Sequence, residues 1–492
     1  MEPQRRGASF SRRQFLARNA WIAGLALAAC RTPATESQPG GAPTTAGAAA
    51  VASTPVAKPA ASGTVDFMGH FTPVAKGGTD PRADAMAKIE EDFKQRYPDI
   101  TIRWQQTAFQ EMADKFLAGF AANTAPDICL FASDGLARVN QMGALGDMLP
   151  YFKTWPQADQ DDFPKGWWDI GMSEGKKVAA PLLFTPEFLI YRKSAFDSIG
   201  VAPSKLKTWD SWLDALQKVV VDGAGKHGTE PGFDPASVKL WGTAFRYGLN
   251  TGGYLPFFQY MMVDKTGHRD IEPPAWKADS WLSDPGIQAI QFHADLITRY
   301  QVQPRSNLNM NLADVQKLFA QGSVAAFSTA TNVFPSIKTS LQFPAEDLAF
   351  GLFPSFDPNK AHGPEFLSHW SMGMSAKSKN RDATLTAISF LESASADLTL
   401  AKIGGQQPKR TSTGKDTFFD APERAYLRMV SQAIAASGSP DIASPVPTNE
   451  LLIQALQKIV SQNAPVKDAV AQAKAQYDKL LSDIPPDMLP KS

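Results

Sequence analysis

Short apolar runs and amphipathic segments alternate along the first half of the chain. Three apolar runs predict strands and two amphipathic segments predict helices: strands at residues 64–68, 100–104 and 127–131, and helices at residues 84–97 and 112–121. In the first helix, Met86, Ile89 and Phe93 recur at helical spacing, and Pro98 ends the element. This short strand, helix, strand succession predicts parallel strands joined by right-handed crossovers.

The predicted parallel sheet locates a candidate site. Ligands of such sheets bind beyond the carboxyl ends of the strands, which here are the loops at residues 70–80 and 132–135. His70 and Phe71 follow the first strand, and Asp134 follows the third. The alternative is a structural role for each of them, as surface-loop or packing residues for the first two and as a helix cap for Asp134.

The N-terminal segment predicts an export signal. Arg12 and Arg13 precede an apolar stretch at residues 21–29, which is far shorter than the roughly 20 residues of a membrane-spanning helix. Residues 1–29 resemble a twin-arginine signal peptide that ends in a lipobox, so Cys30 is the expected lipidation site. Residues 30–63 are rich in Ala, Thr and Pro and predict an extended spacer. The expected location is extracytoplasmic, at the outer face of the cytoplasmic membrane or in the periplasm, and anchored by lipid.

Length and charge narrow the function. The body after the spacer is about 420 residues, which exceeds one compact core and predicts two lobes. The segment before Cys30 holds five arginines and one glutamate, so 44 basic and 48 acidic residues remain without it. This small negative excess argues against nucleic acid as a partner. Cys129, the second of two cysteines, lies in an apolar run and is expected to be a buried strand residue.

Motifs for catalysis and cofactors are missing from the sequence. None of the six histidines is spaced as a helical or zinc-ribbon ligand pair, so we expect no metal site. The sequence has no Gly-x-Ser-x-Gly motif, Walker loop or dinucleotide fingerprint, so we expect no cofactor. A protein that binds without a reaction is therefore favoured over an enzyme.

Six motifs, in the right order, resemble the family 1 extracellular solute-binding proteins of sugar-type ABC importers. They are Tyr191-Arg192-Lys193 with Phe196, Gly200 and Pro203; Thr208-Trp209-Asp210; residues 315–326; residues 350–354; residues 370–380; and residues 404–408 followed by Arg410. The chain departs from the family at Arg192, where asparagine is usual, and at residues 329–334, which lack the usual tryptophan.

The resemblance implies an α/β, two-lobed clamp of the periplasmic-binding-protein type II class, with three hinge crossings. Each lobe would be a sheet flanked by helices, and the lobes would close on the ligand. The implied segments are 64–183 and 369–425 for lobe 1, and 187–365 and 430–485 for lobe 2, with crossings near 181–187, 363–368 and 415–444. The implied partners are a carbohydrate and an ABC permease, and the protein is expected to be a monomer.

The resemblance and the loop positions together give the candidate ligand residues. They are His70, Phe71, Asp134, Thr185, Glu187, Tyr254, Asn332, Trp370, Gln407 and Arg410. Trp370 is a candidate stacking ring because it lies between His369 and Ser371, outside an apolar run. Glu187 has an alternative role in a hinge salt bridge, and Tyr254 has one as a cover for the core.

Two other functions stay open at this stage. The same fold could bind a non-sugar ligand such as a polyamine, a peptide or ferric iron, although iron would call for a tyrosine cluster that the sequence does not show. An exported carbohydrate-active enzyme would need two carboxylates across a cleft. Acidic pairs such as Asp161-Asp162 instead have the character of solvated surface.

Overall fold

The structure is a computed structural model that describes residues 61–73, 80–108, 111–249, 256–267, 276–440, 446 and 448–484. The predicted signal peptide, Cys30, most of the spacer and Tyr254 lie outside these residues. Within the described part of the chain, the helices lack the combination of length and apolar character that crossing a membrane requires.

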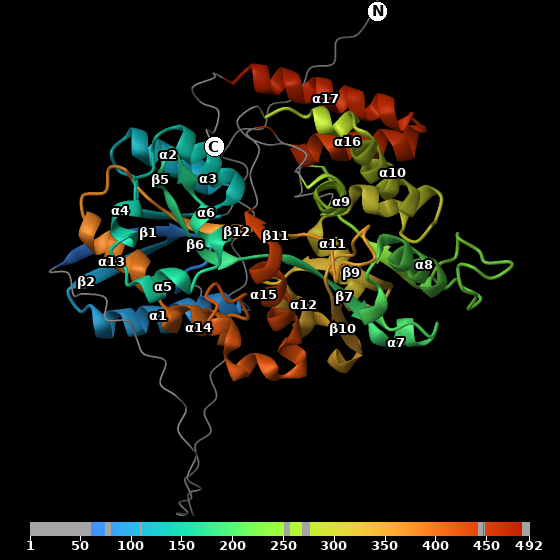
Figure 1. Cartoon of the computed structure of the whole chain (residues 1–492), viewed down its shortest axis with the longest axis horizontal. Coiled ribbons are helices and arrows are strands. Elements are labelled where there is room, and N and C mark those ends of the chain that lie inside the picture. Colours follow the sequence, from blue (N-terminus) through green and yellow to red (C-terminus); the bar gives the residue numbers. More distant parts are fainter. Residues whose placement is uncertain are drawn as a thin grey trace, which may run out of the picture. The chain divides into compact units, whose positions relative to one another are not determined.

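The first lobe is built on a five-stranded sheet of order β2-β1-β3-β12-β6 (Figure 1). Its strands are β1 (Gly63–Gly69), β2 (Ile100–Gln106), β3 (Ile128–Ala132), β6 (Ala179–Phe184) and β12 (His369–Met374). Strand β1 pairs in parallel with β2 and β3, as predicted, whereas β12 runs antiparallel to β3 and β6. The sheet is therefore mixed, and its one reversed strand arrives from a distant part of the sequence.

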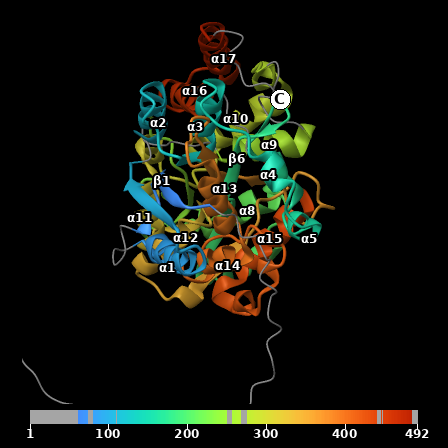
Figure 2. The same ribbon diagram turned by 90° about the vertical axis from the view of Figure 1, so that its left-hand side faces the viewer.

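Helices cover both faces of this sheet. On one face lie α2 (Met112–Ala121) and α3 (Ser133–Gln141), over a cluster that includes Cys129. The opposite face packs against α1 (Pro81–Arg96), α13 (Arg381–Leu391) and α14 (Ala394–Lys402). Figure 2 shows α2 and α3 on one side of β1, and α1 and α14 on the other. Cys129 is fully buried, and burial raises the pKa of its thiol well above the usual value, so the prediction of a buried strand residue is confirmed.

The predicted loop at residues 132–135 is wrong. Helix α3 begins at Ser133, directly after β3, so Asp134 lies in the first turn of a helix. The side chain of Asp134 lies outside the described part of the structure. The N-cap residue of α3 is Ala132, so the alternative role of Asp134 as a helix cap is wrong as well.

The second lobe is built on a four-stranded sheet of order β10-β7-β9-β8. Its strands are β7 (Glu187–Arg192), β8 (Trp241–Ala244), β9 (Val324–Ala330) and β10 (Leu348–Gly351). A separate apolar cluster joins this sheet to α8 (Trp209–Val219), α10 (Asp284–Thr298), α16 (Thr448–Gln462) and α17 (Val466–Ser482). Helix α8 begins with a capping box in which Thr208 and Ser211 bond each other's backbone.

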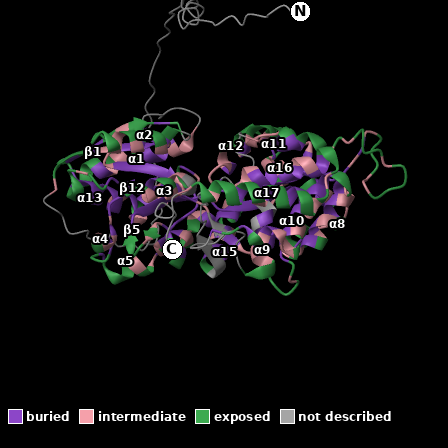
Figure 3. Ribbon diagram, turned by 90° about the horizontal axis from the view of Figure 1, so that it is seen from above, coloured by how far each residue is buried: buried purple, intermediate pink, exposed green. Residues whose placement is uncertain are grey.

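Shorter elements complete the described chain. They are α4 (Leu149–Phe152), α5 (Gln157–Asp161), α6 (Lys165–Asp169), β4 (Met172–Ser173), β5 (Lys176–Lys177), α7 (Lys193–Asp197), α9 (Pro256–Thr266), α11 (Leu312–Ala320), α12 (Phe334–Ser340), β11 (Glu365–Leu367), α15 (Ala425–Ser437) and β13 (Gly438–Pro440). The central strands of both sheets are largely buried, whereas the edge strands β2 and β10 are only partly buried and the outer faces of helices such as α2 and α17 are exposed (Figure 3).

Three connections link the two sheets. Only Thr185 and Pro186 separate β6 of the first sheet from β7 of the second. The return from β10 to β12 passes through β11, and the chain leaves α15 for α16 through β13. Strands β11 and β13 pair in parallel, with Glu365 opposite Gly438, so two of the connections lie side by side.

Helix α15 contacts both lobes. The ring of Tyr426 stacks on Phe188 of β7, with centroids 5.0 Å apart. The backbone carbonyl of Leu427, the next residue, accepts a hydrogen bond of 3.1 Å from the Gln407 side chain. Because the main apolar cluster includes residues of both sheets, the lobes share part of their core through this helix.

Candidate functional site

Strand direction brings one edge of each sheet to the β6–β7 connection. In the first sheet, β3 and β6 both run antiparallel to β12, and β1 pairs in parallel with β3, so β1, β3 and β6 point in the same direction. Their carboxyl ends, at Gly69, Ala132 and Phe184, therefore lie at the edge where the chain crosses to the second lobe. In the second sheet, Glu187 pairs with Ala330, so β9 ends where β7 begins. Residues after these strand ends form the candidate site.

An aromatic group lies at the edge of the first lobe. The rings of His70 and Trp370 are stacked, with centroids 5.8 Å apart and an interplanar angle of 16°. Phe71 meets Trp370 edge-on at 4.9 Å, and it is only 3% exposed. The Arg82 guanidinium lies 4.0 Å above the Phe71 ring. Phe71 therefore supports the other two rings, and His70 and Trp370 are the partly exposed members of the group.

Burial and neighbouring charges set the protonation states of His70 and Asp80 in and beside this aromatic group. Burial lowers the pKa of His70, and a hydrogen bond to the Thr107 backbone opposes this effect only in part. The imidazole is therefore neutral near pH 7. Burial works to raise the pKa of Asp80, but the hydrogen bonds and charge of Arg82 outweigh it and lower that pKa. Asp80 remains ionised and holds Arg82 in place through bonds of 2.8 Å from Nε and Nη2.

Polar side chains lie at the corresponding edge of the second lobe. Glu187 forms an ion pair of 3.4 Å with Arg246, which follows β8 by two residues. Thr331 is fully buried, and its backbone N–H donates a 2.9 Å hydrogen bond to the Pro186 carbonyl. The side-chain oxygens of Thr331 and Asn332 are buried and have no hydrogen-bond partner in the described part of the chain. A buried polar atom without a hydrogen-bond partner destabilises the folded protein, so these two oxygens are candidates for hydrogen bonds to a ligand.

Two predicted residues near the connection, Thr185 and Gln407, make contacts that hold the fold together. The Thr185 N–H donates a 2.7 Å hydrogen bond to the Ser368 carbonyl, which ties β6 to the segment before β12. Gln407 forms an isolated bridge with Phe184, so its backbone lies beside the end of β6. Its amide nitrogen, however, donates to Leu427 and Ser431 of α15. Gln407 is therefore directed toward α15.

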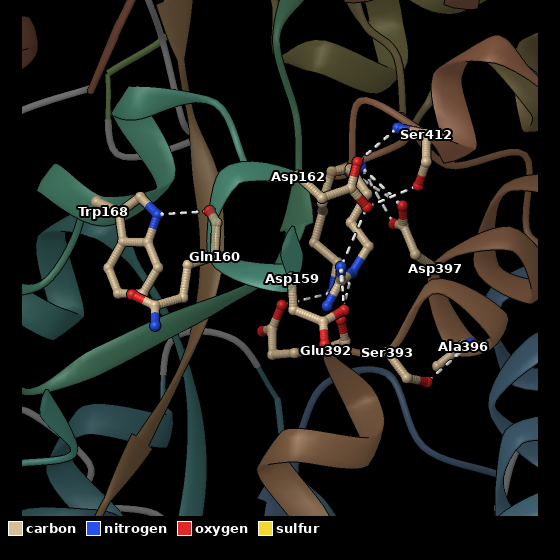
Figure 4. A network of polar contacts seen from close by, with 11 residues as sticks. Asp159, Gln160, Asp162, Trp168, Glu392, Ser393, Ala396, Asp397 and Ser412 are labelled. Carbon is tan, nitrogen blue, oxygen red and sulfur yellow. Dashed lines mark hydrogen bonds and ion pairs between the residues drawn. The ribbon is translucent and has the colours of Figure 1, made fainter. Parts of the chain in front are cut away.

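Arg410 does not lie with the candidate ligand residues. Its guanidinium forms ion pairs with Asp159 at 3.3 Å and Asp162 at 3.1 Å, and it donates a 2.9 Å hydrogen bond to the Glu392 carbonyl. Figure 4 shows these acidic residues converging on one polar network. The guanidinium also covers the Phe163 ring at 4.2 Å. These contacts hold the Arg410 side chain inside the first lobe, and we do not retain it as a ligand residue.

The same network contains a buried ion pair. Lys409 Nζ lies 3.0 Å from Glu392 Oε2, and both side chains are at most 1% exposed. Asp397, also buried, accepts hydrogen bonds from the backbone N–H groups of Lys409 and Arg410, each at 3.1 Å. Burial raises the pKa of Glu392, and the Lys409 charge opposes that rise. The network fastens the segment after α14 to α5 and α13.

The described residues include no group of three or more His, Cys, Asp or Glu side chains that could hold a metal ion.

Residues 75–397 match the profile of the bacterial extracellular solute-binding protein family. The chain belongs to this family. Its proteins are substrate-binding components rather than enzymes. A relative from Sinorhizobium fredii (strain NBRC 101917 / NGR234), a probable amino-acid ABC transporter periplasmic-binding protein, is 20% identical over 411 residues, which cover 82% of this chain and 83% of the relative.

Solved structures confirm the two-lobed fold. The sugar-binding protein MalE from Xanthomonas citri superposes with a TM-score of 0.68 at 18% identity, over 86% of this chain and 98% of that one. The cyclic alpha-maltosyl-1,6-maltose binding protein from Arthrobacter globiformis gives 0.67 at 17%, over 86% and 100%. A solute-binding protein from Agrobacterium vitis S4 with bound D-mannitol gives 0.63 at 17%, over 85% and 98%. The solute-binding family also places the function outside the cytoplasm.

Proposed function

We propose that this protein captures a sugar or a related polyol between its two lobes and delivers it to an ABC permease. The observation that carries the proposal is the partly exposed His70 and Trp370 ring pair at the edge of the first lobe, next to the crossing into the second. Aromatic rings can cover the apolar C–H face of a sugar. The sugar-binding and mannitol-binding proteins of the same fold agree with this ligand class.

The second lobe supplies the polar complement. Glu187 can accept hydrogen bonds from hydroxyl groups, and Arg246 can donate them. Because the two charges cancel, the pair suits a neutral ligand better than an ionic one. Thr331 and Asn332 add uncharged oxygens that a hydroxyl can satisfy. A ligand that touches both lobes stabilises the closed form relative to the open form, and this difference in affinity drives closure.

The proposed location follows from the N-terminus. Lipidation of Cys30 would anchor the protein at the outer face of the cytoplasmic membrane or in the periplasm, and the Ala/Thr/Pro-rich spacer would let the two lobes reach a permease. We propose that the protein acts there as a monomer. Labelling with a radioactive fatty acid tests the anchor, since a Cys30→Ala variant should lose the label.

An amino acid is the second candidate ligand. The Sinorhizobium fredii relative is named as a probable amino-acid transporter component. A paired Glu187 and Arg246 could also meet the ammonium and carboxylate groups of a zwitterion. An amino acid, however, offers at most one or two hydroxyl groups. It would therefore leave the uncharged oxygens of Thr331 and Asn332 with few hydrogen bonds.

Thermal unfolding in the presence of ligand distinguishes these classes. We expect neutral sugars or polyols to raise the unfolding temperature, because ligand at 100 times its dissociation constant adds about 2.7 kcal/mol to the native state. The screen should include mono- and oligosaccharides, polyols, amino acids and polyamines. A response to amino acids alone would replace the proposed ligand class and leave the fold assignment intact.

Thr331→Val tests the polar complement in the second lobe. Valine keeps the buried shape and removes an oxygen that has no partner, so the free energy of unfolding of the ligand-free protein should stay equal or rise slightly. Affinity for the sugar should fall by about tenfold, which corresponds to about 1.4 kcal/mol for one lost hydrogen bond. Calorimetric titration measures the affinity. A variant with unchanged affinity would remove Thr331 from the proposed site.

A further inference from the structure

A buried carboxyl group lies in the second connection between the lobes. Glu365 opens strand β11, its side chain is fully buried, and neither carboxylate oxygen has a hydrogen-bond partner among the described residues. Strand β11 pairs with β13, which belongs to the third connection. The buried carboxyl therefore lies where two of the three inter-lobe connections run side by side.

The elements packed against β11 offer no charge to balance Glu365. Strand β13, Gly438–Pro440, has no ionisable side chain. Helix α15 carries Arg428, but its guanidinium is bonded to Asp420 at 2.6 Å and to the Asp416 carbonyl at 3.1 Å. Helix α15 also contributes Tyr426, whose phenol is neutral because burial raises its pKa.

The other ionisable groups on neighbouring described elements are His369, Lys165 and Asp169. In the adjoining strand β12, His369 pairs with the Ser371 hydroxyl at 2.8 Å. Helix α6, which packs against β13, carries Lys165 and Asp169. Within the described structure, Lys165 does not hydrogen-bond to the Glu365 carboxylate. Burial raises the pKa of Glu365 well above its usual value, so the carboxyl keeps its proton at pH values where an exposed glutamate has lost it.

We propose that Glu365 is a proton-linked positioning residue of the hinge, which favours the paired arrangement of β11 and β13 when protonated and opposes it when ionised. The buried site cannot hold a charge without a partner, so ionisation requires water to enter between the two strands. Proton binding therefore changes the balance between hinge conformations. The ligand need not be known for this linkage to operate.

The direction of the pH effect follows from the raised pKa. Between the ordinary pKa of glutamate, about 4.3, and the higher value of the buried group, the paired hinge binds a proton that the hydrated hinge releases. The paired hinge is therefore most favoured at low pH and is weakened as pH rises through this window. The sign is opposite to that of a carboxylate held by a salt bridge, whose stabilising effect grows as pH rises.

Native-state hydrogen exchange tests the proposal in the full-length protein. We expect the protection factors of the β11 and β13 amides to fall as pH is raised from 6 to 9, approaching about tenfold per pH unit where hinge opening requires ionisation. In Glu365→Gln, which keeps the shape of the protonated acid, these protection factors should not change with pH. Amides of β2, in the far edge of the first sheet, serve as the internal reference because they should behave alike in both proteins.

A second variant guards against misfolding of Glu365→Gln. Glu365→Leu also removes the ionisable group and should unfold at a higher temperature than the wild type at pH 8, with a smaller difference at pH 5. Equal pH dependence of exchange in the wild type and both variants would overturn the proposal. A wild-type hinge whose protection is constant from pH 6 to 9 would do the same. These outcomes are independent of any sugar titration, so they leave the proposed function to its own test.

Discussion

Replacing Lys409 with methionine is expected to lower the free energy of unfolding by about 3–5 kcal/mol at pH 7, the usual cost of leaving one member of a buried ion pair without its partner. Lys409 Nζ is 3.0 Å from Glu392 Oε2, and both side chains are buried. Methionine matches the length of the aliphatic stem, so the loss arises from the charge. Chemical denaturation measures it.

The pH dependence of this loss separates charge from packing. Without Lys409, Glu392 must be protonated to stay buried, so its folded pKa rises further above the value in the unfolded chain. The deficit of Lys409→Met should therefore grow between pH 5 and pH 8. The matched control is Lys402→Met, which removes a partly exposed pair with Asp416 at 3.1 Å and should cost less than about 1 kcal/mol. Adding Glu392→Met to Lys409→Met should recover much of the stability, and its failure to do so would contradict this account.

Replacing Trp370 with alanine is expected to weaken ligand binding by about 30-fold or more, as the loss of a central aromatic contact typically costs at least 2 kcal/mol. Trp370 stacks with His70 and rests edge-on against Phe71. Trp370→Phe retains a flat apolar surface and should lose less affinity. Titration calorimetry with the sugar identified by thermal unfolding measures both effects.

Trp104→Ala is the control for general loss of an aromatic ring. Trp104 is also partly buried, but it packs on Phe67 from the edge strand β2, with centroids 4.7 Å apart. Its removal should lower stability and leave affinity unchanged. If both tryptophan variants lost the same affinity, the Trp370 effect would reflect damage to the first lobe, and the proposed stacking surface would have to be abandoned.

Local patterns were enough to predict the regular elements of the first lobe. The apolar spacing of Met86, Ile89 and Phe93 and the stop at Pro98 agree with α1, and the predicted parallel strands are β1, β2 and β3. The predicted helix at residues 112–121 corresponds to α2. Each of these depends on neighbouring residues alone, which is why the sequence carries the signal.

Side-chain partners distant in sequence were not predictable. Arg410 follows a loop that resembles the family pattern, yet its partners Asp159 and Asp162 lie about 250 residues away and direct it into the first lobe. Arg246 was missed because only the register of β8 beside β9 brings it to Glu187. The one sequence signal for Arg246 was its position two residues after the short strand β8. Asp134 was expected in a loop because the residues around it give no sequence signal for the abrupt start of α3 at Ser133.

The short link between β6 and β7 has a mechanical consequence. The Thr185 N–H is tied to Ser368, and the Pro186 carbonyl is tied to Thr331, so this link is fastened on both sides. Proline also fixes one of its backbone dihedrals. Any swing of one lobe against the other must then pivot here, with little sliding. Groups beside the pivot, such as Glu187, would travel least during such a swing, while helices at the periphery would travel farthest. Distance probes for lobe motion thus gain sensitivity with their separation from Pro186.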